Sequence, residues 1–262
     1  MIRDAAGNLY GTTLHGGRDP LQICNSGDGC GIVFKLDITG QETVLYSFRG
    51  EEDGGESTGG LVMDGSGNLY GTTQIGGDQN CAGGYGCGTV FKLDKNGSET
   101  VLYSFTGGAD GLSPAAGLVR DAAGNLYGTT WQGGDLTCQN FGCGTVFKVD
   151  GAGRETTIHS FTAGKDGAFP AAALIRGTGG VIWGTTVIGG ALNSGTMFRV
   201  DPSGKEIVLH SFTGGADGSG PYAGVIRDAA GNFYGLTNNA GDLTCNQGNG
   251  CGTVYKIAAV AP

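Results

Sequence analysis

The sequence has few basic residues, few histidines and no long apolar segment, and each shortage limits what the protein can be. Its 262 residues contain 15 Lys and Arg against 24 Asp and Glu, giving a formal net charge of −9. This acidic balance disfavours nucleic acid and anionic membrane surfaces as partners. No apolar run approaches the length of a membrane span, so we expect no membrane insertion.

The short sequence motifs of several enzyme classes are also missing. There are only three histidines, and the sequence contains no Gly-x-Ser-x-Gly elbow, no His-Glu-x-x-His and no phosphate-binding glycine loop. These absences argue against a serine hydrolase of the elbow type, a zinc protease and a nucleotide-binding enzyme.

Glycine, by contrast, is abundant, and it belongs to an internal repeat. The chain has 56 glycines and six prolines, close to the composition of a disordered chain, but regular apolar and aromatic columns exclude that reading. The motif Asn-Leu-Tyr-Gly-Thr-Thr begins at Asn8, Asn68 and Asn125, and looser copies begin at Val181 and Asn232. Successive starts lie 60, 57, 56 and 51 residues apart. A period of this size indicates a repeat architecture.

One repeat contains four short segments of strand type. In the third copy they are residues 117–121, 125–130, 144–150 and 155–161, separated by turns and one long loop. Four antiparallel strands in this length are typical of a propeller blade. We therefore predict an all-β, five-bladed β-propeller of four-stranded antiparallel blades, whose last blade lacks its outer strand. It would be a single domain over residues 1–262, with approximate blades 1–49, 50–106, 107–162, 163–213 and 214–262.

The repeated segments resemble a known family. The run Gly-Leu-Val-Arg-Asp-Ala-Ala-Gly-Asn-Leu-Tyr-Gly-Thr-Thr, followed by Gly-Thr-Val-Phe-Lys, resembles the GloVer (Gloeo/Verruco) tandem repeat of bacterial surface proteins over nearly the whole chain. The fourth copy departs from the pattern, with Gly177 in place of the turn aspartate. The resemblance implies one specific activity, acyl-homoserine lactone hydrolysis, which has been associated with proteins that carry these repeats.

Eight cysteines form four close pairs in the sequence. The pairs are Cys24 with Cys30, Cys81 with Cys87, Cys138 with Cys143, and Cys245 with Cys251. Their even number and similar spacing favour four small disulfide rings and an oxidising compartment. Zinc is the alternative, but it needs four ligands at one point, whereas these pairs belong to separate repeats. We expect a secreted, periplasmic or cell-surface protein; since Met1 leads directly into repeat sequence, a leader would have been removed or the chain is a fragment.

The loops after the second strand, and those between repeats, differ most among the copies. Function on a rigid scaffold concentrates in such loops. Their acids and non-repeated aromatics suit a cation, a sugar or a polar small molecule. We predict ligand contacts for Trp131, Gln132, Asp135, Tyr222, Asn238, Asn239 and Asp242. The alternative is that the loop acids maintain solubility and the aromatics cover the core.

Two catalytic or cofactor roles follow as hypotheses. His15 lies just beyond a second strand, and with Asp19 it could serve as a base with its orienting carboxylate. Asp53, Asp110, Asp166 and Asp217 each precede glycine, which favours ordinary turns, although a ring of carboxylates and carbonyls near the channel could hold Ca²⁺. The first functional hypothesis is a secreted hydrolase of a small lactone or ester. The alternative is a non-catalytic module that binds glycan or protein at the cell surface.

Overall fold

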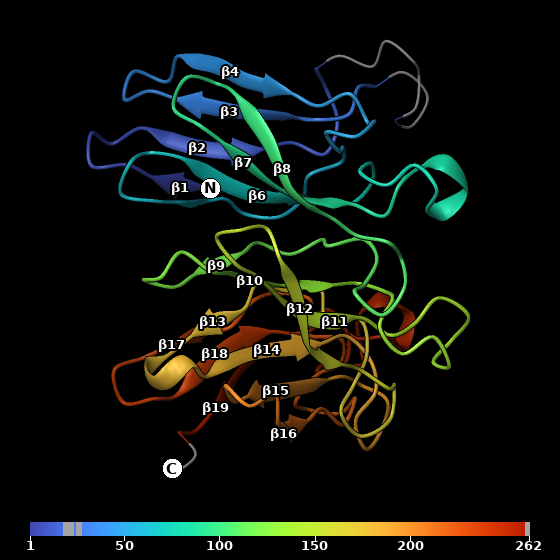
Figure 1. Ribbon diagram of the computed structural model, residues 1–262. Coiled ribbons are helices and arrows are strands. Elements are labelled where there is room, and N and C mark those ends of the chain that lie inside the picture. The colour runs from blue at the N-terminus through green and yellow to red at the C-terminus, as the bar shows by residue number, and fades with distance from the viewer. Residues whose placement is uncertain (18–23, 25–27, 260–262) are drawn as a thin grey trace. The chain divides into compact units, whose positions relative to one another are not determined.

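The computed structural model describes residues 1–17, 24 and 28–259, which form five antiparallel sheets, one for each copy of the repeat (Figure 1). The first sheet contains β1 (Ile2–Arg3), β2 (Leu9–Thr12), β3 (Ile32–Leu36) and β4 (Glu42–Ser47). The second contains β5 (Val62–Met63), β6 (Leu69–Thr73), β7 (Thr89–Leu93) and β8 (Glu99–Ser104). The third contains β9 (Val119–Arg120), β10 (Leu126–Thr130), β11 (Thr145–Val149) and β12 (Glu155–Ser160).

The last two copies differ in strand number. The fourth sheet contains β13 (Ile175–Arg176), β14 (Ile182–Thr186), β15 (Thr196–Val200) and β16 (Glu206–Ser211). The fifth contains β17 (Ile226–Arg227), β18 (Phe233–Leu236) and β19 (Val254–Ile257), so it has three strands within the described residues. The prediction of four strands in each of four repeats and three in the last is confirmed. The first strand of each sheet is only two residues long, shorter than the predicted 117–121.

Among the residues that the structure describes, helical structure is limited to short turns. They are η2 (Ala82–Gly84), η3 (Thr178–Gly180) and η4 (Asn246–Gly248). Within the described part of the chain, no helix has the length and apolar character that crossing a bilayer requires.

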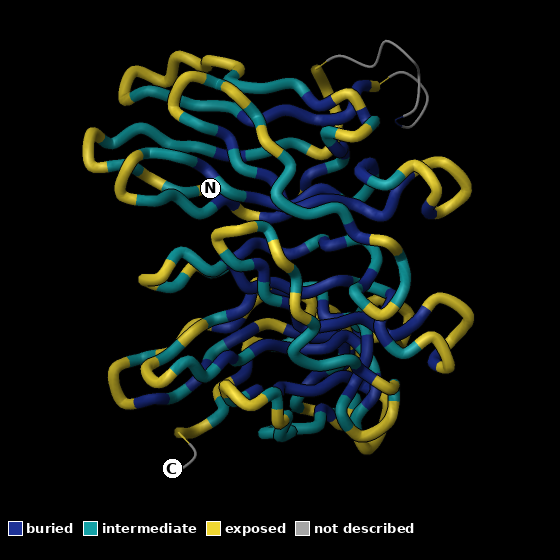
Figure 2. Tube along the Cα trace, in the orientation of Figure 1, coloured by how far each residue is buried: buried dark blue, intermediate teal, exposed yellow. Residues whose placement is uncertain are grey.

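The chain forms two compact units. The first contains residues 1–128 and 148–156, and the second contains residues 129–147 and 157–262. Phe48, Leu61 and Phe91 are buried in the core of the first unit, and Met197, Phe212 and Tyr255 in a core cluster of the second. Strand centres are buried while turn tips are exposed (Figure 2).

Each glycine of the Asn-Leu-Tyr-Gly-Thr-Thr motif makes room for an aromatic ring on the next strand. Gly71 pairs with Phe91 across β6 and β7, and Gly184 pairs with Phe198 across β14 and β15. A Cβ atom on Gly71 would lie 2.6 Å from Cζ of Phe91. The glycine is therefore required because the ring covers its backbone.

The two threonines of the motif form hydrogen bonds with different parts of the structure. The second one bonds within its own sheet, as between the hydroxyls of Thr73 and Thr89, which are 2.8 Å apart. The first one donates to a carbonyl in the loop that leads to the next sheet. These bonds are Thr12 to Gly59 at 3.1 Å, Thr72 to Ala116 at 3.1 Å, Thr129 to Pro170 at 3.2 Å and Thr185 to Pro221 at 3.1 Å.

The prediction of four small disulfide rings is confirmed, and zinc as the alternative is thereby excluded for these cysteines. Each bridge closes a loop between the second and third strands of its sheet, with Cα–Cα separations from 5.1 to 6.0 Å. Such a small ring contributes about 2 kcal/mol through the unfolded state. The fourth sheet has no such bridge, and Ser194 stands in the shortened loop. The bonded pairs are Cys24 with Cys30, Cys81 with Cys87, Cys138 with Cys143, and Cys245 with Cys251.

Replacing Gly71 with alanine should lower the free energy of unfolding by about 1–3 kcal/mol, because the added methyl overpacks the core against Phe91. Denaturant titration measures the change. Gly65→Ala is the matched control in the same sheet, since nothing lies within 4 Å of its added methyl. Equal stability of the two variants would contradict the assigned role of Gly71.

Candidate functional site

Three aromatic side chains from three different loops stack on one another in the second unit. Trp131 follows β10, Phe169 lies in the loop between β12 and β13, and Tyr222 lies in the loop between β16 and β17. The Trp131 ring centroid is 5.0 Å from that of Phe169, with 21° between the planes, and 6.0 Å from that of Tyr222, with 23° between the planes. Tyr222 is 48% exposed. The arrangement, here called the aromatic stack, is therefore partly accessible to solvent.

The backbone at Phe169 adopts a conformation that bulky residues avoid. Its φ angle is 57°, a left-handed value that costs roughly 1–2 kcal/mol for an L-residue. The equivalent positions Glu56, Ser113 and Gly220 share it, with φ of 56°, 57° and 64°. The loop geometry therefore belongs to the repeat, and the Phe169 N–H is fixed by a 2.9 Å bond to the Cys143 carbonyl. A large ring on such a backbone is typical of a functional position.

Asn238 and Asn239 lie beside Tyr222 because their loops share hydrogen bonds. The Gly220 carbonyl accepts from the N–H groups of Asn238 and Tyr222, at 3.0 and 2.9 Å. The Asn239 N–H donates to the Ser219 carbonyl at 3.0 Å. Both asparagines are exposed. Two exposed amide side chains thus lie in the loop next to that of Tyr222.

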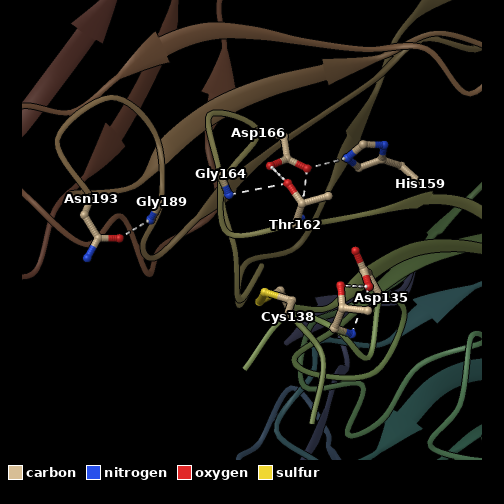
Figure 3. Close-up of a disulfide and its surroundings, with 10 residues drawn as sticks. Asp135, Cys138, His159, Thr162, Gly164, Asp166, Gly189 and Asn193 are labelled. Atoms are coloured by element: carbon tan, nitrogen blue, oxygen red, sulfur yellow. Dashed lines mark hydrogen bonds and ion pairs between the residues drawn. A yellow bond between two sulfur atoms is a disulfide. The ribbon is translucent and has the colours of Figure 1, made fainter. Parts of the chain in front are cut away.

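The other predicted contact residues have local backbone roles. The Gln132 carbonyl accepts from the Thr130 hydroxyl at 2.8 Å, which fixes the chain directly after Trp131. Asp135 Oδ1 accepts from the N–H and hydroxyl of Thr137, at 2.9 and 2.6 Å (Figure 3). Asp242 binds Thr244 in the same way. The threonine hydroxyl is the main reason that the pKa of each carboxyl lies below its usual value.

Of the predicted catalytic pair, only His15 lies within the described residues. His15 is exposed and belongs to the first unit, and its carbonyl accepts from the Thr13 hydroxyl at 2.6 Å. Among the described residues, none forms a hydrogen bond or ion pair with its imidazole. Asp19 lies outside the described residues, so the pairing of the two stays a prediction.

Sequence reasoning missed a pair of carboxyl groups in the first unit. Glu99 and Asp53 line a cavity of 950 Å³ together with Arg49 and Asp78. Oε1 of Glu99 is buried without a hydrogen-bond partner. Burial, with the nearby Asp53 carboxylate, raises the pKa of Glu99 to about 7. Burial also raises the pKa of Asp53, which accepts from the Tyr46 hydroxyl at 2.9 Å.

The second unit contains a related arrangement. Burial is the main cause that raises the pKa of Glu206 to about 7, and Asp166 adds to it. Asp166 Oδ2 lies 3.4 Å from Nε2 of His159, and Oδ1 accepts from the Thr162 hydroxyl at 2.6 Å (Figure 3). Burial opposes ionisation of Asp166, but the bonds from His159 and Thr162 lower its pKa overall. The sequence signal that could have identified these carboxyl groups is a glutamate that begins the fourth strand of each four-stranded sheet. These residues are Glu42, Glu99, Glu155 and Glu206.

The four aspartates considered for calcium have other partners. Asp53 and Asp110 each accept from a tyrosine hydroxyl at 2.9 Å, and Oδ2 of Asp217 lies 3.0 Å from Nε2 of His210. Among residues 1–17, 24 and 28–259, no three His, Cys, Asp or Glu side chains converge to hold a metal ion. Calcium dependence itself stays a prediction.

The fold is shared with several solved structures of low sequence identity. A gluconolactonase from Xanthomonas campestris is 14% identical, with a TM-score of 0.50 over 87% of this chain and 70% of that one. A luciferin-regenerating enzyme is 12% identical, with a TM-score of 0.51 over 89% and 75%. A protein from Bacteroides uniformis, provisionally named a 6-phosphogluconolactonase, is 14% identical, with a TM-score of 0.56 over 97% and 65%.

Five antiparallel sheets built from one recurring motif define an all-β tandem-repeat protein. The Gloeobacter/Verrucomicrobia repeat pattern matches residues 1–142 and, overlapping them, residues 80–261. The chain therefore belongs to the Gloeobacter/Verrucomicrobia repeat family, which confirms the resemblance. Among curated proteins, none matches the sequence.

Glu99→Gln should stabilise the protein at about pH 8 and leave its stability nearly unchanged at about pH 4. The pKa of Glu99 in the folded state, about 7, exceeds its ordinary value of 4.5. The contribution of Glu99 to folding stability is therefore fully present below pH 4.5 and is lost as the pH rises through 7. A neutral amide avoids that loss, worth about 1 kcal/mol after discounting for partial exposure.

Denaturant titrations at the two pH values measure this difference. Glu42→Gln is the matched control, because Glu42 begins the equivalent strand of the first sheet and is exposed. A Glu99→Gln effect that is the same at both pH values would show that the carboxyl does not titrate as assigned.

Proposed function

We propose that residues 1–262 form one five-bladed β-propeller that binds a small polar ring, a sugar unit or a lactone, at the aromatic stack. The five sheets and the similar solved folds support the propeller. The single observation that carries the binding function is the stacking of Trp131 with Phe169 and Tyr222. An aromatic face covers the apolar face of a ring, and neighbouring amides bind its oxygen atoms.

The stack is the place where the repeats differ in chemistry while keeping the same backbone. The positions equivalent to Trp131 are Leu14, Gln74, Val187 and Asn238. The positions equivalent to Phe169 hold no other aromatic residue, although they share its left-handed φ. Packing of the repeat therefore does not require these rings. A ligand that contacts one side of a quasi-symmetric molecule accounts for rings in only some copies.

Lactone hydrolysis is the second candidate, with acyl-homoserine lactones as the specific substrate class. The exposed His15 imidazole, which no described residue binds, favours it. In this reaction His15, oriented by Asp19, takes a proton from water as the water oxygen attacks the lactone carbonyl. The ring C–O bond then breaks, and the leaving oxygen receives the proton.

The compartment follows from the four disulfides. Bridges of this kind persist in oxidising surroundings. We place the protein outside the cytoplasm, as a secreted, periplasmic or cell-surface protein.

Trp131→Ala should weaken ligand binding roughly tenfold or more, because it removes the ring common to both stacked pairs. Titration with cello-oligosaccharides, gluconolactone and hexanoyl-homoserine lactone, followed by calorimetry, measures the affinity. Phe141→Ala is the matched control, because Phe141 is an aromatic residue of the same loop between β10 and β11 and is 62% exposed. Equal loss in both variants, or no saturable binding by the unaltered protein, would refute the assignment.

His15→Ala should abolish lactone turnover without changing the melting temperature, because an exposed side chain contributes little to stability. Ring opening of hexanoyl-homoserine lactone, followed by pH-stat, measures turnover. Preincubation with EDTA tests calcium separately, since a metal-assisted reaction stops on chelation. Unaltered turnover in the variant would reject His15 as the base, and glycan binding without any turnover would favour the binding module alone.

A further inference from the structure

The second unit contains a cavity that is separate from the aromatic stack. It has a volume of 490 Å³ and lies between β13 and β17, which run next to each other in Figure 1. Trp183, which lines the cavity, is near the start of β14, whereas Trp131 of the stack follows the end of β10, the equivalent strand of the third sheet. The volume is within the usual range for small-molecule sites.

The cavity depends on two linked departures from the repeat. Gly177 replaces the turn aspartate, and Trp183 replaces the motif tyrosine. A Cβ atom on Gly177 would lie 2.5 Å from Cη2 and Cζ3 of Trp183. The indole therefore occupies the space of the missing side chain. As a result, this copy has lost a carboxylate and gained a flat aromatic wall.

The charges around the cavity favour an anion. Arg176 and Arg227 line it, against the single carboxylate of Asp228. That carboxylate is already engaged, since it accepts from Asn232 Nδ2 at 2.8 Å and from the Tyr234 hydroxyl at 3.0 Å. Arginine recurs at this strand position, as Arg3 and Arg120 in other sheets, so what sets this cavity apart is the aspartate that Gly177 has replaced. Such a cavity attracts anions from solution.

Arg227 packs against aromatic rings at the edge of the cavity. The Arg227 guanidinium carbon lies 5.0 Å from the Trp183 ring centroid and 5.4 Å from that of Phe233. Arg227 is thus held by two aromatic faces, and it contributes a fixed positive charge. Arg176 lines the same cavity from the neighbouring sheet. Its planar fork has the geometry that binds a carboxylate through two parallel hydrogen bonds.

We propose that this cavity binds a small organic carboxylate that has a flat apolar group. The carboxylate lies at Arg176, and the apolar group lies against Trp183 and the aliphatic side chains of Ile175, Val225 and Ile226. A dianion such as phosphate is disfavoured because the Asp228 carboxylate is at the same cavity. Binding at this cavity does not depend on the proposed lactone hydrolysis or on the aromatic stack.

The two tryptophans of the chain allow a specific test, because Trp131 and Trp183 are the only ones. In a Trp131→Phe background, Trp183 alone reports by fluorescence. Benzoate should cause a saturable change, benzyl alcohol none, and inorganic phosphate a weaker one. The proposal is overturned if benzoate gives no saturable change, if benzyl alcohol matches it, or if phosphate binds more tightly.

A variant of the anion-binding residue tests the role of charge. Arg176→Gln in the same background should weaken benzoate binding roughly tenfold or more, the usual loss for a charge-assisted bond. Arg120→Gln is the matched control, since Arg120 holds the equivalent position in the third sheet. Unchanged benzoate affinity in Arg176→Gln, or an equal loss in both variants, overturns the proposal.

A second variant keeps the test decisive if Arg176→Gln does not fold. Gly177→Asp combined with Trp183→Tyr restores the aspartate and tyrosine found at Asp64 and Tyr70 in the second repeat. It adds a carboxylate and removes the indole, so benzoate binding, measured by saturation-transfer NMR, should be lost. Retained binding would show that these two departures do not create the site.

Discussion

The hydrogen bond from the first motif threonine to the loop of the next repeat is the constraint on which the architecture depends. Four copies of it, at 3.1 to 3.2 Å, connect Thr12, Thr72, Thr129 and Thr185 to carbonyls ahead of the following sheet. Three of these donors are buried, where an unpaired polar group costs about 1–3 kcal/mol. Each sheet therefore fixes the later part of the loop that leads to the next sheet.

A fixed loop backbone allows the side chains on it to vary. The left-handed position occupied by Phe169 accepts glutamate, serine or glycine elsewhere with the same φ. The energy that holds this conformation comes from bonds between backbone groups, such as that to Cys143, which do not depend on the side chain. Rings can consequently be added in some copies without disturbing the packing, and the aromatic stack has arisen in this way.

The charged groups also divide into those that recur in several repeats and those that change in a single copy. Glu99 and Glu206 recur at one strand position, each near the aspartate of the loop that precedes its sheet, and their raised pKa values reflect burial in the repeat. By contrast, Gly177 and Trp183 occur once and remove a carboxylate from a cavity that two arginines line. Recurrent charge is thus a property of the scaffold. A charge that changes in only one copy indicates a part of the surface whose binding properties differ from those of the other copies.

The sequence by itself determined the sheets and the disulfides, because both depend on local information. Each repeat carries its own glycine and aromatic pair, and bonded cysteines such as Cys81 and Cys87 lie only five or six residues apart. It also indicated the loops that contain Trp131 and Tyr222. Only the tertiary structure decided that these rings stack, that Phe169 joins them and that Glu99 lies beside Asp53. The physical reason is that these contacts join segments far apart in the sequence, and the spacing of residues within a repeat contains no information on how such segments pack against one another.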